Sequence, residues 1–415
     1  MAVEFLTLEH PVARAEKRAR TLPIRHARRL RRILNLDDFQ RAARLLLPRA
    51  IYGYVANGSE DETALAANRA AFRDYRLIPR VLVGVGERSQ RTTLLGRQYA
   101  APFGIAPMGG SSAVTYDGDL RMARAAARRD IPFMLSGNSI VPMEEVARAY
   151  PGAWFDSYQS PTTRAIEGMV ERVAAAGFPV FVSTVDVPVG SNREKDHRAG
   201  FTQPIRLNPK IIRDGLLHPN WVLSTAVRTL LERGLPRIQN LDYDGGPSLF
   251  SRTVTKIAAH AELSWEHVRL IRRLWKGPFV LKGLLSREDA RIARDHGVDG
   301  IVVSNHGGRQ LDNAASPLQV LADIVAEAGE MAVMIDSGFR RGTDVLTALA
   351  LGADFVFIGR PFLFAAAVAG EAGVLHAIDL LSKEIDRDMA LLGLRRVEEV
   401  GRDFLLDLRQ AERRP

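Results

Sequence analysis

The nonapeptide from Ser304 to Asp312, Ser-Asn-His-Gly-Gly-Arg-Gln-Leu-Asp, contains the residue types that most clearly suggest chemistry. His306 can exchange a proton near neutral pH, and Arg309 can bind a carboxylate through two parallel hydrogen bonds. Gly307 and Gly308 allow the backbone to approach a ligand that a Cβ would keep away. A base beside a carboxylate clamp suits an enzyme that acts on the carbon next to an acid group. The competing interpretation is a glycine turn with a core histidine and a solvated arginine.

Polar residues also follow other apolar runs of the sequence. Lys282 comes directly after Phe279-Val280-Leu281. Burying its ammonium group without a partner would be costly, so we expect this lysine at a site rather than in a core. Asp186 follows the run Val180–Val185. A carboxylate at that point could orient a histidine and stabilise its protonated form.

Two loops late in the chain combine glycines with arginines. The first reads Ile335-Asp336-Ser337-Gly338-Phe339-Arg340-Arg341, and the second reads Gly359-Arg360-Pro361. Backbone amides of glycine-rich loops and bidentate guanidinium groups both bind phosphate. These loops therefore predict a phosphorylated cofactor. A solvated surface role fits Arg341 better than Arg340.

The elements that must position these residues alternate between short apolar runs and segments of helical periodicity. Ser160-Pro161 and Ser316-Pro317 are predicted to begin helices as N-cap and first-turn residues. Eight strands with intervening helices predict a (β/α)8 TIM barrel, in which the active site lies at the C-terminal ends of the strands. A doubly wound sheet is the alternative, but no Gly-x-Gly-x-x-Gly follows the first strand. The predicted strands are Phe103–Ala106, Phe133–Leu135, Trp154–Ser157, Val180–Val185, Phe279–Lys282, Gly300–Val303, Val333–Asp336 and Phe355–Ile358.

The charge distribution divides the chain into three parts. Residues 1–34 form a basic N-terminal arm with nine Lys and Arg against three Glu, a net charge of +6 out of +9 for the chain. Residues 35–400 form the barrel domain with an N-terminal helical extension, Asp37–Ala71, and residues 401–415 form a C-terminal tail. Because only +3 remains outside the arm, the barrel is not predicted to bind nucleic acid. We interpret the arm as a solvated extension, with contact to anionic lipid or nucleic acid as the alternative.

The composition limits the compartment and the cofactors. The chain has no cysteine, which excludes disulfides and thiolate metal sites, and we predict no metal. No apolar run approaches the ~20 residues of a membrane span, and the first residues lack the apolar core of a secretory signal. We therefore expect a cytoplasmic protein.

An insertion over residues 198–261, after the fourth strand, is too long for an ordinary loop. Its segment Pro219–Arg233 has a helical stripe of apolar residues. The stripe consists of Leu223, Val227, Leu230 and Leu231. We favour a lid helix that packs this stripe on the barrel mouth, because its polar face holds only two cations. The alternative is peripheral attachment to the inner face of a membrane.

The nonapeptide, Lys282 and the two glycine–arginine loops resemble those of the FMN-dependent 2-hydroxy-acid oxidases and dehydrogenases. This family includes glycolate oxidase, the flavin type of lactate dehydrogenase and mandelate dehydrogenase. The resemblance extends from about Leu36 to Leu392. It implies FMN-dependent oxidation of a small (S)-2-hydroxy acid to the 2-oxo acid, in the manner of lactate or mandelate dehydrogenase. It also implies quinone or O2 as the electron acceptor and a homotetramer.

The resemblance assigns a role to each matching residue. It implies His306 as the base, Asp186 as support for its cation and Tyr158 as the hydrogen-bonding partner of the substrate hydroxyl. The implied substrate-binding residues are Tyr54, Arg193 and Arg309. The implied FMN-binding residues are Pro107, Met108, Gly109, Ser136, Asp156, Thr184, Lys282, Ser304, Asp336, Ser337, Gly338, Arg340, Gly359 and Arg360.

Three residues depart from the family pattern. Met108 replaces a threonine, Asp156 replaces a glutamine before the catalytic tyrosine, and Asn138 stands at an often aromatic pocket position. A carboxylate at Asp156 should disfavour a negatively charged reduced flavin and so lower its potential. Gly109 matches the glycine that family dehydrogenases carry where oxidases more often have alanine, so we favour a dehydrogenase.

Three other functions compete with this interpretation. The first is a soluble 2-hydroxy-acid oxidase that passes electrons to O2. The second is a redox-neutral flavin isomerase on the same fold, which would not need Arg309 as a carboxylate clamp beside His306. The third is a non-catalytic FMN-binding protein with a basic arm, which should have lost the active-site residues that this chain retains.

Overall fold

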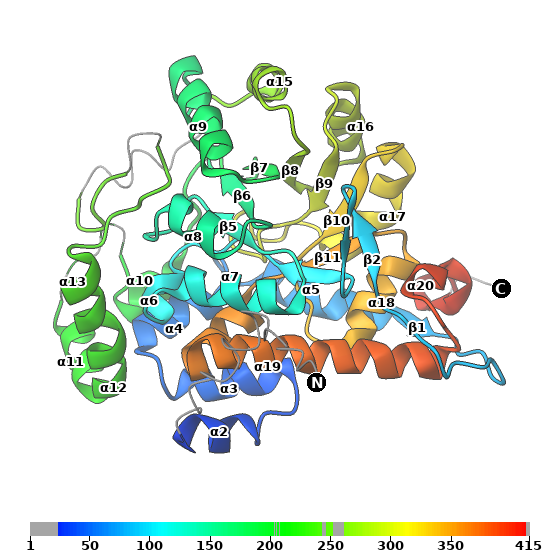
Figure 1. Cartoon of the computed structure of the whole chain (residues 1–415), viewed down its shortest axis with the longest axis horizontal. Coiled ribbons are helices and arrows are strands. Elements are labelled where there is room, and N and C mark those ends of the chain that lie inside the picture. Colours follow the sequence, from blue (N-terminus) through cyan, green and yellow to red (C-terminus); the bar gives the residue numbers. More distant parts are fainter. Residues whose placement is uncertain are drawn as a thin grey trace, which may run out of the picture.

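Eight parallel strands form the centre of the computed structural model, which describes residues 24–202, 204, 206, 208–242, 246–251 and 261–411 (Figure 1). Their order is β4-β11-β10-β9-β8-β7-β6-β5, and a parallel bridge between Ile105 and Phe133 joins the two edge strands. The predicted TIM barrel is confirmed, and the doubly wound alternative is wrong. The strands are β4 Phe103–Ile105, β5 Met134–Ser136, β6 Trp154–Ser157, β7 Phe181–Thr184, β8 Phe279–Leu284, β9 Gly300–Val303, β10 Ala332–Ile335 and β11 Phe355–Ile358.

The barrel interior has two layers with opposite chemistry. Alternate residues of a strand face the same side, so a residue two positions beyond an inward-facing one also faces inward. The lower layer is apolar and contains Met134, Trp154, Val182, Val280, Val302 and Met334. Two positions further along each strand, at or just beyond its C-terminal end, lies what we call the polar layer: Ser136, Asp156, Thr184, Lys282, Ser304 and Asp336. All six of these side chains are buried.

Helices form the outer ring of the barrel (Figure 1). Ser316 is the N-cap residue of α17 as predicted, and its backbone amide donates to the Gln319 side chain at 3.2 Å. The prediction for Ser160 is wrong, because the hydroxyl of Thr162 accepts the capping hydrogen bond from the amide of Ala165 instead. The ring helices are α7 Gly118–Arg129, α8 Met143–Ala149, α9 Thr163–Ala176, α15 Trp265–Leu274, α16 Arg287–Asp295, α17 Pro317–Ala328, α18 Gly342–Ala350 and α19 Arg360–Leu392.

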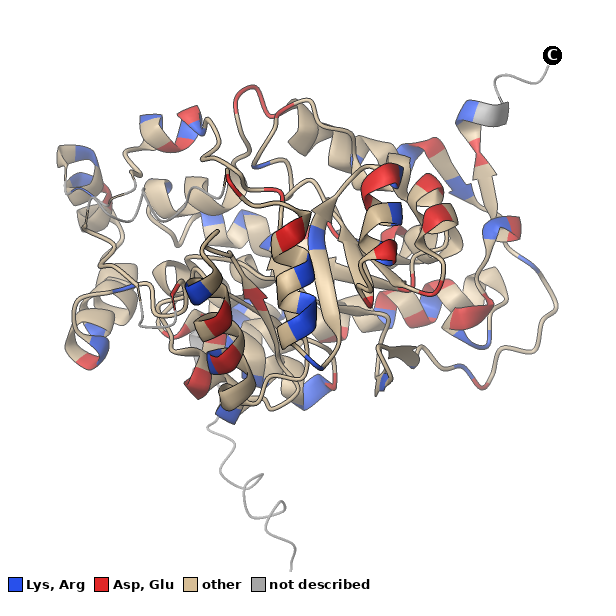
Figure 2. Ribbon diagram, turned by 90° about the horizontal axis from the view of Figure 1, so that it is seen from above, with Lys and Arg blue, Asp and Glu red and all other residues tan. Residues whose placement is uncertain are grey.

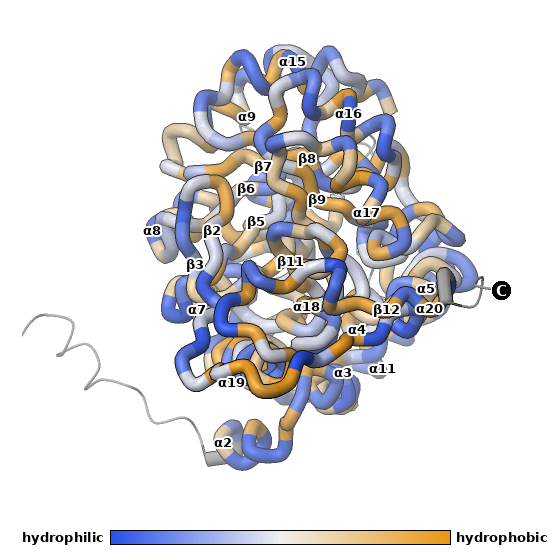
Figure 3. Tube along the Cα trace, turned by 90° about the vertical axis from the view of Figure 1, so that its right-hand side faces the viewer, coloured by the Kyte–Doolittle hydropathy of each residue, from blue (hydrophilic) through white to orange (hydrophobic). Residues whose placement is uncertain are grey.

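Helix α19 is the one helix among the described residues that is long and apolar enough to cross a membrane. Its most apolar window is 72% buried inside the protein, and its backbone leaves the helical conformation at Ala369 and Gly370. Figure 3 shows apolar residues along α19 and in the barrel strands. We therefore assign α19 to the core.

The N-terminal extension consists of several short helices rather than the one predicted over Asp37–Ala71. Pro48, which has no amide hydrogen to donate, immediately precedes one of them. The arm set apart as residues 1–34 includes a helix whose last residue, Leu30, lies in the core together with Ile33, while residues 1–23 are outside the described part. The helices are α2 Ile24–Leu30, α3 Leu36–Arg44, α4 Arg49–Ala56, α5 Thr63–Ala70 and the 3-10 turn η1 Ala71–Asp74.

Two small antiparallel pairs of strands complete the fold. Strand β1, Tyr75–Leu77, pairs with β12, Leu405–Asp407, so the segment separated as a C-terminal tail contacts the N-terminal extension. Buried Phe404 anchors it there. The other pair is the hairpin β2–β3. The remaining elements are β2 Thr92–Leu94, β3 Arg97–Tyr99, α6 Ser111–Val114, η3 Val397–Glu399, η4 Arg402–Phe404 and α20 Leu408–Ala411.

The insertion forms helices at one edge of the molecule, at the left in Figure 1. Helix α10, Glu194–Ala199, leads into the insertion, which contains α11 Pro209–Leu217, α12 Pro219–Trp221, the π-helical turn η2 Val222–Val227 and α13 Arg228–Arg233. Residues 203, 205, 207, 243–245 and 252–260 of the insertion are outside the described part. The last three helical elements are continuous, which confirms the predicted helix over Pro219–Arg233.

The side of this helix that contacts the barrel is opposite to the one we expected. Trp221 donates from Nε1 to the carbonyl of Ala113 at 2.9 Å, and Arg233 pairs with Asp117 and Glu145. The predicted apolar stripe faces outward instead, with Leu223 66% and Leu231 81% exposed. The expectation that a lid helix packs its apolar stripe on the barrel mouth is therefore wrong, because polar contacts hold the helix in place.

Candidate active site

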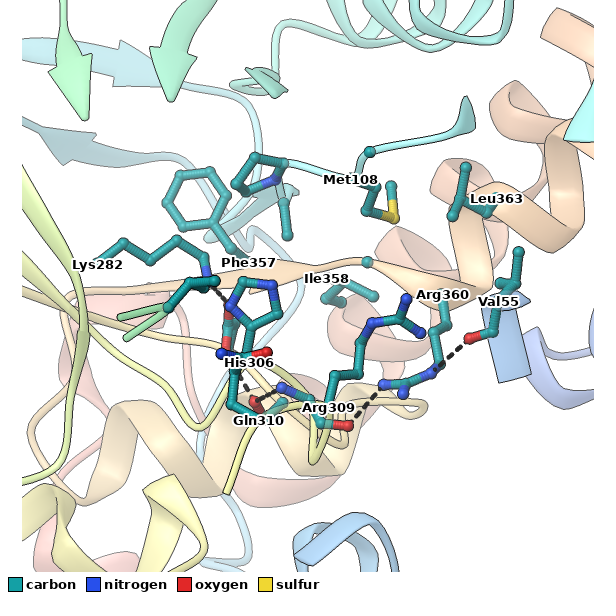
Figure 4. Close-up of a pocket in the computed structure, with 18 of the residues that line it drawn as sticks. Val55, Met108, Lys282, His306, Arg309, Gln310, Phe357, Ile358, Arg360 and Leu363 are labelled. Carbon is teal, nitrogen blue, oxygen red and sulfur yellow. Dashed lines mark hydrogen bonds and ion pairs between the residues drawn. The ribbon is translucent and has the colours of Figure 1, made fainter. Parts of the chain in front are cut away.

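A cavity of about 290 Å³ lies at the C-terminal ends of the barrel strands. Figure 4 shows Lys282, His306, Arg309 and Arg360 around it. Most of the predicted site residues contribute to its walls. These are Tyr54, Pro107, Met108, Gly109, Tyr158, Arg193, Lys282, His306, Arg309, Asp336, Ser337, Gly338, Arg340, Gly359 and Arg360.

His306 and Asp186 form a hydrogen-bonded pair at this end of the barrel. His306 Nδ1 lies 3.0 Å from Asp186 Oδ1, and the His306 backbone is left-handed, with a φ of 57°. A carboxylate accepts hydrogen bonds, so it fixes the proton on Nδ1 and leaves Nε2 as the basic nitrogen. Burial would raise the pKa of Asp186, but the charge and hydrogen bond of His306 hold it below its usual range. The pair can therefore receive a proton as a supported base.

Gly283 makes room for this pair. Its φ is +114°, and a Cβ built there would lie 2.5 Å from Cγ of Asp186. The register between β8 and β9 shifts at the same point, between Lys282 and Leu284. The backbone of β8 therefore has to be glycine where it passes the carboxylate. Sequence reasoning missed Gly283, because its partner lies almost a hundred positions earlier in the chain.

Two arginines converge on Tyr54 at one side of the cavity. Arg309 Nη1 and Arg193 Nη2 both donate to the Tyr54 carbonyl, at 2.7 and 2.9 Å. Their guanidinium groups lie 5.1 and 4.9 Å from the centre of the Tyr54 ring. Burial, with the nearby charge of Arg193, lowers the pKa of Arg309 to about 10. Asp196 pairs with Arg193. The charge of Arg309 is thus poorly compensated, which favours binding of a carboxylate.

A second cationic group lies in the loops after β10 and β11. Arg360 donates to the carbonyls of Val55, Asn57 and Gly307. Burial lowers its pKa well below the usual range, and the charges of Arg309, Arg340 and Arg193 lower it further. Burial likewise lowers the pKa of Arg340 to about 10. In contrast, Arg341 is 45% exposed and pairs with Glu384, as its solvated interpretation predicted.

The polar layer forms the floor beneath these groups. Lys282 Nζ lies 3.1 Å from Asp336 Oδ2 and 3.2 Å from Ser304 Oγ. Burial alone would lower the pKa of Lys282, but Asp336, Asp186 and Asp156 together raise it, so the lysine is charged. Asp156 accepts a hydrogen bond of 2.6 Å from Thr184. This floor therefore presents a fixed positive charge to the cavity through Lys282.

Tyr158 and the loop after β4 form the opposite wall. Burial, with the charges of Asp156 and Asp186, raises the pKa of Tyr158 well above 10, so it retains its proton and can donate. Gly109 lies close to Asn138, and a Cβ on Gly109 would be 2.9 Å from the Asn138 Cβ. Tyr54 donates its hydroxyl to the Gly109 carbonyl at 3.2 Å. An alanine at 109 would therefore have to displace Asn138.

Known proteins resemble this chain over almost its whole length. The family model described as FMN-dependent dehydrogenase matches residues 43–407. The chain belongs to the FMN-dependent dehydrogenase family. It is 39% identical to (S)-mandelate dehydrogenase of Pseudomonas putida over 375 residues, covering 90% of this chain and 94% of that one. It is 38% identical to an L-lactate dehydrogenase of Stenotrophomonas maltophilia (strain R551-3), covering 89% and 98%.

Solved structures agree with the sequence relatives. A crystal structure of the monotopic membrane protein (S)-mandelate dehydrogenase superposes with a TM-score of 0.82 at 37% identity. The superposition covers 91% of this chain and 100% of that one. The chain is therefore an FMN-dependent oxidoreductase on a TIM barrel.

The site fits FMN on the chemistry of its donors. The pKa values of the buried Arg340 and Arg360 are lowered even though Arg340 pairs with Asp37 at 3.3 Å, and a phosphate group would compensate the positive charge of both arginines. Gly338, beside them, has a φ of +92° and no room for a Cβ, which would lie 2.3 Å from the Asn68 carbonyl oxygen. Lys282, which is charged and buried beneath the cavity, would place a positive charge beside a bound flavin ring.

Some predicted residues lie just outside the cavity walls. Ser136, Asp156, Thr184 and Ser304 lie in the polar layer, and Asp186 lies behind His306. The nonapeptide itself divides between two roles. Asp312 accepts hydrogen bonds from the amides of Thr63 and Ala64, so it caps α5 rather than contacting a substrate. Asn305 forms a reciprocal amide pair with Asn68, which sequence reasoning also missed.

Proposed function

We propose that this FMN-dependent dehydrogenase oxidises an (S)-2-hydroxy acid to the corresponding 2-oxo acid. The observation that carries the proposal is the supported base His306 in one cavity with the under-compensated cation of Arg309. Arg309 and Arg193 hold the carboxylate, with Tyr54 completing this side of the cavity. Tyr158 donates to the substrate hydroxyl oxygen, and its raised pKa keeps that proton in place.

His306 takes one of the two protons that the substrate loses, on Nε2. Asp186 stabilises the resulting imidazolium, as its lowered pKa indicates. When bound, FMN would accept the two electrons together with the second proton. His306 takes either the hydroxyl proton or the Cα proton of the substrate. The total of two protons and two electrons that leave the substrate is the same in both cases. The residues that would hold the phosphate of FMN are Arg340, Arg360, Ser337, Gly338 and Gly359.

An anaerobic substrate panel tests this function. The purified protein should be yellow, release FMN on denaturation, and lose its absorbance near 450 nm when a cognate (S)-2-hydroxy acid is added. The matched (R) acid should leave the flavin oxidised. A protein that stays colourless with added FMN, or whose flavin no 2-hydroxy acid reduces, would contradict the proposal.

We also propose that the insertion attaches the enzyme to the membrane surface and that a quinone accepts the electrons. Leu223, Leu230 and Leu231 are exposed on one helix, and Leu216 and Leu217 are exposed on the helix before it. Exposed leucines of this number are typical of an interaction surface rather than of a water-facing one. The similar mandelate dehydrogenase structure is that of a monotopic membrane protein.

Vesicle co-sedimentation separates this proposal from a soluble oxidase. The protein should bind anionic vesicles, and the triple variant Leu223→Gln, Leu230→Gln, Leu231→Gln should lose binding while its flavin is still reduced by substrate. The control is Ile78→Gln. Ile78 is an exposed apolar residue directly after β1, outside the insertion, and this variant should still bind the vesicles. Failure to bind vesicles together with rapid turnover on O2 would favour the oxidase. We also propose that the protein is a homotetramer, and light scattering of the purified protein measures its oligomeric state.

A further inference from the structure

The polar layer contains one more carboxyl group than its single lysine compensates. Lys282 is surrounded by Asp336, Asp186 and Asp156, and all three affect its ionisation. Asp336 contacts it directly at 3.1 Å, and Asp186 is committed to His306. Asp156 is left as the third carboxyl group, on the opposite side of the barrel interior from β10.

One oxygen of the Asp156 carboxyl group can bind a proton, because none of the described residues donates a hydrogen bond to it. Its side chain is fully buried. Oδ1 accepts from the Thr184 hydroxyl at 2.6 Å, but Oδ2 is buried without a hydrogen-bond partner among the described residues. An ionised carboxylate with an unsatisfied buried oxygen is costly, whereas a protonated one removes the charge.

The groups around Asp156 oppose each other. Burial and the charges of Asp186 and Asp336 raise its pKa, Lys282 and the Thr184 hydrogen bond lower it, and together they give a pKa of about 7. Tyr158, two residues further along, is neutral at this pH. The carboxyl group is therefore poised between its two states near neutral pH, and a small change in local charge moves it.

Reduction of the flavin is such a change. Two electrons and one proton convert the oxidised ring to its anionic reduced form, which adds one negative charge to the cavity above Lys282. We propose that Asp156 takes up a proton, in addition to the one that the flavin binds, when the bound flavin is reduced. Asp156 releases this proton when the flavin is reoxidised. The proposal rests on the FMN site argued above. In this proposal Asp156 acts indirectly, because its protonation changes the net charge around Lys282.

The pH dependence of the flavin midpoint potential tests this without any substrate. Each proton taken up in a two-electron reduction shifts the potential by about 30 mV for a tenfold change in proton activity. The parent enzyme should lose about 30 mV per pH unit at low pH and about 59 mV per unit over a window that begins near pH 7. Asp156→Asn should keep the shallower slope throughout, so that its potential exceeds that of the parent by an amount growing with pH.

A second buried carboxyl group provides the matched control. Burial raises the pKa of Asp119 to about 6, but Asp119 bonds to Ser139 outside the polar layer. Asp119→Asn should keep the steep window of the parent. A parent slope equal to that of Asp156→Asn, or a steep window that survives in Asp156→Asn, would overturn the proposal.

A direct proton count covers the case in which Asp156→Asn does not fold. Reduction of the parent in weakly buffered solution with an indicator dye should consume close to two protons per flavin just above pH 7, and close to one well below it. Consumption that does not change across this range would overturn the proposal. Because electrochemical reduction needs no hydroxy acid, failure of the substrate panel would contradict the proposed function but not the role of Asp156.

Discussion

The polar layer and the insertion helix depart from the usual distribution of residues in opposite directions. In the polar layer, Lys282 and the two carboxyl groups of Asp156 and Asp336 are buried, where charged side chains are rare. On the insertion helix, Leu223 and Leu231 are exposed while Thr225 and Thr229 are buried. Each departure costs stability unless a further molecule binds there. We infer from this comparison that buried charge marks the proposed active site, whereas exposed apolar surface marks the proposed attachment site.

Elsewhere the surface follows the ordinary pattern. Figure 2 shows Lys and Arg interspersed with Asp and Glu over the outer helices. Many of these form exposed ion pairs, such as Arg291 with Glu288 and Arg287 with Glu327. Exposed pairs of this kind contribute at most about 1 kcal/mol each. The two regions therefore stand out from a surface of mixed charge.

The largest expected effect is on the rate of flavin reduction when His306, the proposed proton acceptor, is replaced. His306→Ala should lower the rate of flavin reduction by the substrate by about 10²- to 10⁴-fold, because proton transfer loses its acceptor. FMN should remain bound, since the phosphate-binding arginines are untouched. Stopped-flow absorbance under anaerobic conditions measures the rate. Reduction near the parent rate would show that another group is the base.

The next largest effect distinguishes a buried arginine from an exposed one. Arg309→Lys removes the planar fork that binds a carboxylate, so KM should rise about 10-fold or more, equivalent to about 1.4 kcal/mol. Arg341→Lys is the matched control, because Arg341 is 45% exposed and pairs with Glu384 of α19. Steady-state kinetics with the cognate acid compares them. Equal KM values for both variants would remove Arg309 from the substrate site.

A smaller effect tests whether polar contacts mount the insertion helix. Arg233→Gln breaks partly buried ion pairs with Asp117 and Glu145 and should destabilise this contact by about 1–3 kcal/mol. Limited proteolysis within the insertion should then become several-fold faster. Arg198→Gln is the control, since Arg198 forms an exposed pair with Glu194 within α10. If both variants are cut at the parent rate, contacts other than the ion pairs of Arg233 hold the insertion helix on the barrel.

The smallest effect concerns acid stability. The pKa of Asp186 is lowered on folding, so its contribution to stability is present above its unfolded pKa of about 3.9 and is lost as pH falls through the folded value. The difference in Tm between the parent and Asp186→Asn should therefore shrink as the pH falls below about 4. Thermal scans from pH 3 to 7 measure it. A difference that stays constant would mean that Asp186 is not stabilised by charge.

The sequence predicted the barrel because its strands are buried on both sides and read as apolar runs. The same runs predicted the polar groups at their ends, such as Lys282 and Asp336. It could not predict which side of the insertion helix packs. Periodicity shows that Leu223 and Leu230 share a side, but only the positions of Asp117 and Glu145 on the barrel decide that the opposite side is held.

Other features depend on contacts between distant residues. The close approach of Gly283 to Asp186 has no signature at either position alone. Strands β1 and β12 are three residues each, too short to show alternation, and they lie at opposite ends of the chain. For the same reason the sequence could not show that Asp156 lacks a second hydrogen-bond partner.

The pairing of β1 with β12 has a consequence for synthesis of the protein. The first strand to leave the ribosome pairs with the last one, and α3 near the start packs on α19 near the end. At about 5–20 residues per second, the N-terminal extension must wait roughly 20–80 seconds for its partners. During that time Leu36 and Phe39, both buried in the finished protein, have no α19 to cover them. We expect the nascent chain to depend on chaperones until its final residues emerge.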